Sequence, residues 1–145
     1  MFSLQTIFGS GQQFYDLLDE AAAAAHASAS ALHSMMKAAD RQPALDPFKL
    51  ARQRERAASE KIGKALVDSF ITPIEREDIE ALGSALYRIP KQVEKFADRY
   101  SLAVRHLEDI DFAPRAAMLE QAAGVVVLAH DVGDRGALRR VLSRA

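Results

Sequence analysis

Two histidines are the first residues whose type and spacing could support chemistry. His26 and His33 lie seven residues apart, which places both imidazoles on one face if the segment is helical. Two imidazoles could supply half of the ligands of a zinc site. However, no carboxylate lies between them or within one turn of either, and none of the four histidines belongs to a Glu-x-x-His pair. We therefore expect ordinary surface histidines.

The other candidates for catalysis form no recognised constellation. Ser28, Ser30 and Ser34 lie near the histidines, but the chain has no Gly-x-Ser-x-Gly elbow. Gly9-Ser10-Gly11 lacks the strand and the lysine of a phosphate-binding loop and predicts a flexible joint before the first helix. The absence of cysteine excludes disulfides, thiolate zinc sites and a cysteine nucleophile. We predict a non-enzymatic chain without a cofactor.

Composition favours a helical domain. The chain has 145 residues, which suggests one domain, and it combines five prolines, seven glycines and no tryptophan with abundant alanine, leucine, arginine and glutamate. No apolar run reaches the roughly 18 residues of a membrane span, so a soluble chain is expected. The absence of cysteine fits the cytoplasm, where we expect the protein. The net charge of −1 gives no overall signal for nucleic acid, and no helix-turn-helix is recognisable.

Apolar residues recur at helical spacing along nearly the whole chain and predict helices at residues 12–40, 47–71, 73–109, 113–131 and 134–145. The third has the clearest seam, because its apolar residues follow at alternating steps of four and three, as in Leu82, Leu86, Ile89 and Val93. We expect the other helices to cover it in an antiparallel all-α bundle. The alanines at residues 21–25 are either a low-complexity run or, as we favour, a surface for close helix packing.

Local signals mark the start and a bend of the third predicted helix. Thr72, Pro73 and Glu75 have the order of a capping box with proline in the first turn. Pro90 would remove one hydrogen bond inside the helix. It therefore predicts a bend or a split into two helices, and the uninterrupted apolar spacing favours the bend.

One face of the second predicted helix is basic, with Lys49, Arg52, Arg54, Arg56, Lys61 and Lys64. Surface lysines and arginines are the rule in folded proteins, so this face can be a solvated surface. The alternative is a docking patch for an acidic partner or for anionic lipid headgroups. Charge alone leaves both interpretations open.

The segment Phe70-Ile71-Thr72-Pro73-Ile74-Glu75-Arg76-Glu77-Asp78-Ile79 closely resembles the signature of the PhoU-like family of phosphate-transport accessory proteins, in the branch found beside Pit-type inorganic phosphate transporters. Met1-Phe2-Ser3-Leu4 and Phe14-Tyr15-Asp16-Leu17-Leu18 look like the start of that branch. The resemblance implies an all-helical fold of two three-helix bundles. Because Ala145 shows no stop signal, we expect a chain truncated there, with the second bundle incomplete.

The resemblance also implies, for many members, metal ions held by acidic motifs of the type Glu-x-x-x-Asp. This chain departs from those motifs, because serine, tyrosine and two cations replace acids and two glutamates remain. The positions concerned are Glu55, Ser59, Tyr87, Arg88, Lys91 and Glu94. The cations would repel a metal ion at this place. We therefore expect no metal there.

The resemblance implies a non-catalytic accessory or regulatory protein that contacts a Pit-type transporter at the cytoplasmic face of the inner membrane, with peripheral membrane contact left open. The expected contact residues, facing acidic loops or headgroups, are Arg52, Arg56, Lys64, Arg88 and Lys91. The alternative is a self-associating helical scaffold unrelated to phosphate, in which an apolar stripe of Val125, Val126, Leu138 and Leu142 is covered by dimerisation. We expect a homo-oligomer.

Overall fold

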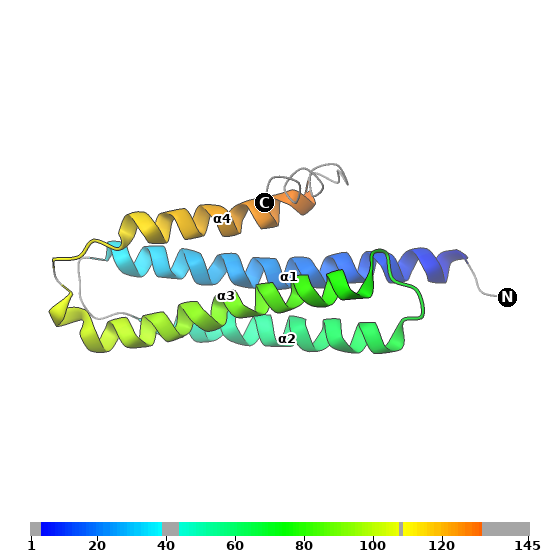
Figure 1. Cartoon of the computed structure of the whole chain (residues 1–145), viewed down its shortest axis with the longest axis horizontal. Helices are drawn as coiled ribbons and strands as arrows, with labels where there is room; N and C mark the ends of the chain where they lie inside the picture. Colours follow the sequence, from blue (N-terminus) through cyan, green and yellow to red (C-terminus); the bar gives the residue numbers. More distant parts are fainter. Residues whose placement is uncertain (1–3, 39–43, 108, 132–145) are drawn as a thin grey trace.

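The computed structural model describes residues 4–38, 44–107 and 109–131, and these residues form helices and connecting segments without any strand. The helices are α1 (Leu4–Lys37), α2 (Asp46–Asp68), α3 (Arg76–Ala103) and α4 (Ala113–Asp131), and a short 3₁₀ helix, η1 (Val104–His106), follows α3. Consecutive helices run antiparallel, and α4 lies on the side of α1 opposite to α2 and α3 (Figure 1). The predicted all-α class is confirmed for the described residues. The PhoU-like arrangement stays a prediction.

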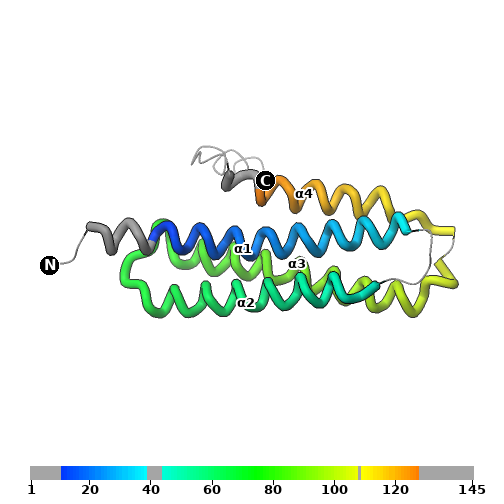
Figure 2. Tube along the Cα trace, turned by 180° about the vertical axis from the view of Figure 1, so that it is seen from behind, coloured from blue at the N-terminus to red at the C-terminus, as the bar shows by residue number. Residues whose placement is uncertain are grey.

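Among the described helices, α1 packs against α2, α3 and α4, whereas α3 and α4 do not pack along each other. Figure 2 shows the same arrangement from behind, with α1 between α4 and the other two helices. The prediction that the third helix is the centre of the bundle is therefore wrong. The reason is that α1 has buried residues around more of its circumference, whereas the apolar seam of α3 occupies a single face of that helix.

Small side chains allow α1 to be central. Its buried residues include Ala21, Ala22, Ala24, Ala25 and Ala29, each at most 4% exposed, and alanine lets neighbouring helices approach closely on more than one side. The burial of four of the five alanines at residues 21–25 supports the close-packing interpretation of the run. Larger side chains of α1 fill the space between α2 and α3 at the end where α1 begins, with Phe14, Leu17 and Leu18 in the core.

α3 continues through Pro90 as a single helix, as the uninterrupted apolar spacing favoured, and the alternative of a split into two helices is excluded. Pro90 is buried, as are Leu86, Val93 and Ala97 on the same face. A proline inside a helix costs roughly 3 kcal/mol. We attribute the persistence of the helix to the burial of this face on both sides of the proline.

The connection between α2 and α3 differs most from the sequence-based expectation. α2 ends at Asp68 and α3 begins at Arg76, so both helices are shorter here than predicted. Glu75 is the N-cap residue of α3 and makes no capping hydrogen bond with its side chain. The hydroxyl of Thr72 instead donates to the carbonyl oxygen of Ile74, 2.7 Å away. The predicted capping box is wrong because Thr72 is used inside the turn.

The first helix begins at Leu4 and includes Gly9, Ser10 and Gly11, so the expected joint is wrong. A glycine costs only about 1 kcal/mol in a helix interior. A Cβ atom on Gly11 would lie 3.6 Å from the Cβ atom of Pro73, so this part of α1 lies against the α2–α3 turn. The predicted helix at residues 134–145, with Leu138 and Leu142, lies outside the described residues. None of the described helices is long and apolar enough to cross a bilayer.

Candidate functional site

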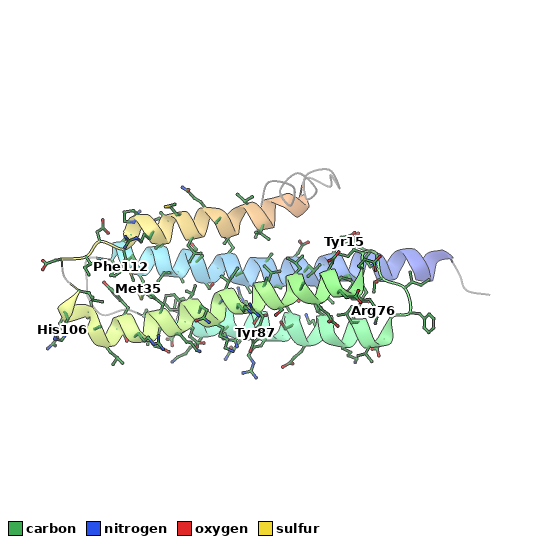
Figure 3. All side chains as sticks on the ribbon, in the orientation of Figure 1. Tyr15, Met35, Arg76, Tyr87, His106 and Phe112 are labelled. Carbon is green, nitrogen blue, oxygen red and sulfur yellow. The ribbon has the colours of Figure 1, made fainter. Side chains whose placement is uncertain are left out.

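A group of polar residues between α2 and α3 contains most of the positions singled out by the family resemblance. We define the Arg52 cluster as Arg52, Glu55, Ser59, Tyr87, Lys91 and Glu94. On α2 these residues follow at steps of three and four, and on α3 at steps of four and three, so each helix presents one polar row to the other. Figure 3 shows Tyr87 on α3 where this helix faces α2.

Glu55 is the buried centre of the cluster. Its side chain has 0% exposure, and a buried carboxylate is costly unless it is paired and hydrogen-bonded. Both oxygens have partners: Oε2 lies 2.8 Å from Nη1 of Arg52, and Oε1 accepts a hydrogen bond of 2.7 Å from the hydroxyl of Ser59. The carboxylate is therefore held by its own helix, with its charge balanced by Arg52.

Arg52 joins the two helices. Its Nη2 donates to the hydroxyl of Tyr87 at 2.7 Å, and its Nε lies 3.8 Å from Oε2 of Glu94. The guanidinium carbon also lies 4.3 Å from the centre of the Tyr87 ring, which is a cation–π distance. Only 14% of the Arg52 side chain is exposed. Arg52 is thus turned inward rather than presented to a partner.

The contact with Arg52 changes the pKa of the Tyr87 hydroxyl. The hydrogen bond from Arg52 and then the positive charge of Arg52 lower the pKa of the Tyr87 hydroxyl below its ordinary value, against the opposing effect of desolvation. Lys91 contributes in the same direction, and its Nζ lies 5.4 Å from the ring centre. For the Tyr87 hydroxyl, the effects of the two cations therefore outweigh the opposing effects of desolvation and of Glu55.

The residues of the Arg52 cluster do not fit a metal ion. Glu55 and Glu94 are the carboxylates present, and the guanidinium of Arg52 contacts both. Within the described part of the chain, no group of three or more histidine, cysteine, aspartate or glutamate side chains is arranged to hold a metal ion. In the cluster an arginine supplies the positive charge that a metal would bring, and it cannot be deprotonated in proteins.

The other predicted contact residues lie differently. Arg56, Lys64 and Arg88 are exposed, and Lys91 is half-buried beside Tyr87. Of the five predicted contact residues, the structure therefore brings Arg52 and Lys91 together around Tyr87 and leaves three on the surface. A hollow of about 310 Å³ continues from the cluster along the two helices, and its lining includes Ser59, Gly63 and Gly83.

Sequence reasoning missed a polar contact between α1 and α4. Nδ1 of His33 lies 2.5 Å from Oε2 of Glu120, with both side chains about one quarter exposed. Hydrogen bonds from Ser30 and then His33 lower the pKa of Glu120, and His26 adds a smaller electrostatic effect. The expectation of ordinary surface histidines is wrong for His33. Its carboxylate partner is 87 residues away in the chain, so no local spacing could reveal it.

Comparisons with known proteins found no relative of this chain. No family model, curated protein or solved structure matches this chain. What the Arg52 cluster and the exposed cations can do therefore follows from their own contacts.

Proposed function

We propose that this chain is a non-catalytic accessory protein of inorganic phosphate transport, which acts by contact with a Pit-type transporter at the cytoplasmic face of the membrane. The proposal depends mainly on one observation: one basic residue is engaged in an internal ion pair, while other basic residues are exposed on the surface. Arg52 neutralises a buried carboxylate, whereas Arg56, Lys64 and Arg88 remain exposed. The phosphate connection is supported by the resemblance of residues 70–79 to the PhoU-like signature.

The Arg52 cluster supports a binding protein rather than an enzyme. The carboxylate of Glu55 is fully buried and receives hydrogen bonds from two side chains, so it is not placed to exchange a proton with a substrate. The cluster instead connects α2 to α3 and fixes the surface that these helices present. A rigid surface loses little conformational entropy when it binds a partner.

The exposed cations supply the contact. A lysine or arginine close to an anionic membrane surface contributes about 1 kcal/mol of attraction, and acidic protein loops would act in the same sense. Arg56, Lys64, Arg88 and the half-buried Lys91 form the proposed contact set. Arg52 is left out of this set because its guanidinium is already engaged.

The test is recovery of the transporter with the full-length tagged chain from solubilised membranes. The triple variant Arg56→Glu, Lys64→Glu and Arg88→Glu should lose most of the recovered transporter. A matched triple variant, Lys37→Glu, Arg105→Glu and Arg115→Glu, changes the net charge equally at exposed residues elsewhere and should retain it. Equal recovery with both variants would remove the proposed surface.

A specific observation favours the alternative of a self-associating scaffold. Met118, Val125 and Val126 of α4 are 70%, 53% and 42% exposed, and exposed apolar residues on one helix are suited to self-association. Sedimentation of the full chain distinguishes the alternatives. Dimers that dissociate in the variant Met118→Ser, Val125→Ser and Val126→Ser would support the scaffold, and a monomer at high concentration would exclude it.

A further inference from the structure

The last turn of α2 and the turn that joins it to α3 expose several apolar side chains. Phe70 is fully exposed, and Val67, Ile71 and Ile74 are 85%, 58% and 38% exposed. We call these four residues the apolar tip. Single exposed apolar residues are common on protein surfaces, but several gathered in one short segment indicate an interaction site.

The apolar tip is held in place rather than loosely attached. Arg76 donates hydrogen bonds to the carbonyl oxygens of Ser69, at 3.0 Å, and of Leu66, and it thereby connects the end of α2 to the start of α3. Figure 3 shows Arg76 at this end of the bundle. The amide of Ser69 also donates to the carbonyl of Ala65 at 3.0 Å. Because the backbone is fixed before binding, little conformational entropy would be lost in a complex.

Contact with α1 adds to this support. The Cβ atom of Pro73 lies 3.6 Å from the position that a Cβ on Gly11 would occupy, so the turn rests against the first helix. Inside the turn, Thr72 donates to the carbonyl of Ile74. The segment thus uses its polar groups internally and leaves Phe70 and Ile71 facing outward.

Most of the ionisable residues that border the apolar tip are acidic, and the exposed Lys64, one helical turn before Val67, is the basic neighbour on α2. Between residues 67 and 78 the ionisable residues are four carboxylates and one arginine, namely Asp68, Glu75, Glu77, Asp78 and Arg76. The four carboxylates are exposed, whereas the arginine is engaged with backbone carbonyls. Anionic headgroups would repel this border. A protein surface rich in lysine and arginine would attract it.

We infer that the apolar tip is the anchor of a protein contact, and that it enters an apolar pocket bordered by lysine and arginine on the partner. This inference rests on the proposed function, because the cytoplasmic loops of membrane proteins carry an excess of lysine and arginine. The apolar tip would meet those basic loops, and the exposed cations of α2 and α3 would meet acidic segments or headgroups.

The test uses the full chain and the Pit-type transporter in nanodiscs of uncharged lipid. The double variant Phe70→Ser and Ile71→Ser should bind at least about tenfold more weakly, as expected for loss of a central anchor. Leu102→Ser removes an 86% exposed apolar side chain of α3 and should bind as the wild type does. Asp68→Asn with Glu77→Gln should weaken binding and reduce its salt dependence.

The outcomes separate the two proposals. If the wild-type chain binds and the Phe70 and Ile71 variant binds equally well, the anchor is excluded while the proposed function stands. If the wild-type chain does not bind the transporter at all, both proposals fail. Binding to anionic vesicles without the transporter that is lost in the same double variant would identify lipid as the target and overturn the protein contact.

Discussion

Arg52 on α2 lies over the ring of Tyr87 on α3, with 4.3 Å between the guanidinium carbon and the ring centre, while its Nη2 donates to the hydroxyl of the same tyrosine. The same arginine neutralises Glu55, which is fully buried. One side chain therefore balances an internal charge and joins two helices. The first consequence concerns stability.

Arg52→Ala should lower the free energy of unfolding by about 3 kcal/mol, because it leaves the buried carboxylate of Glu55 without its charge partner. Arg56→Ala, four residues along the same helix and exposed, should change it by less than about 0.5 kcal/mol. Urea denaturation measures both. Nearly equal decreases in the free energy of unfolding for Arg52→Ala and Arg56→Ala would mean that the ion pair does not support the fold. The double variant Arg52→Met with Glu55→Leu should recover much of the loss, since it removes both charges.

Tyrosine ionisation provides an independent test of the same contact. Arg52 lowers the pKa of Tyr87, so Arg52→Met should move the ionisation of Tyr87 to higher pH. The ultraviolet titration of wild type minus that of Tyr87→Phe isolates this residue. Because the folded state releases the proton at lower pH than the unfolded state, this contribution to stability grows as pH rises through the folded pKa. An unchanged Tyr87 titration in Arg52→Met would contradict the contact.

Acid should weaken the attachment of α4 to α1. The pKa of Glu120 is lowered by Ser30 and His33, so its contribution to stability is complete above the ordinary value of 4.5 and is lost as pH falls through the folded value. Urea midpoints between neutral and acidic pH should fall less steeply in Glu120→Gln than in the wild type. Glu60→Gln, at an exposed position, should follow the wild-type curve. Parallel curves for Glu120→Gln and wild type would exclude this linkage.

The close packing around α1 can be tested with one substitution at two positions. Ala21 has 0% exposure, so Ala21→Leu should lower the free energy of unfolding by about 1–3 kcal/mol through overpacking. Ala23 lies two residues away on the same helix and is exposed, so Ala23→Leu should have little effect. A tolerated leucine at position 21 would show that the neighbouring helices do not approach closely there.

Sequence patterns predicted the helical class because apolar spacing is a local property of each helix. They did not predict that α1 is the central helix, because this depends on how many neighbours pack against its alanines. Thr72 and Glu75 had the right types for a capping box. The box does not form because Thr72 hydrogen-bonds to Ile74 within the turn.

The candidate site was predictable only in part, for a similar reason. The resemblance identified Glu55, Tyr87 and Glu94 as positions of interest, but charge alone could not show which cation of α2 turns inward. That depends on Tyr87, which lies 35 residues from Arg52 in the chain. The exposure of Phe70 likewise depends on where α2 ends. The predicted helix extended to residue 71 and included Phe70, so it did not indicate this exposure.

Equilibrium binding of the full chain to a Pit-type transporter in nanodiscs, with an unrelated membrane protein in identical nanodiscs as the control, tests the proposed function most directly. We expect saturable binding to the transporter that weakens when Arg56, Lys64 and Arg88 are reversed in charge, and none to the control protein. Equal binding to both membrane proteins, or to neither, would contradict an accessory role in phosphate transport.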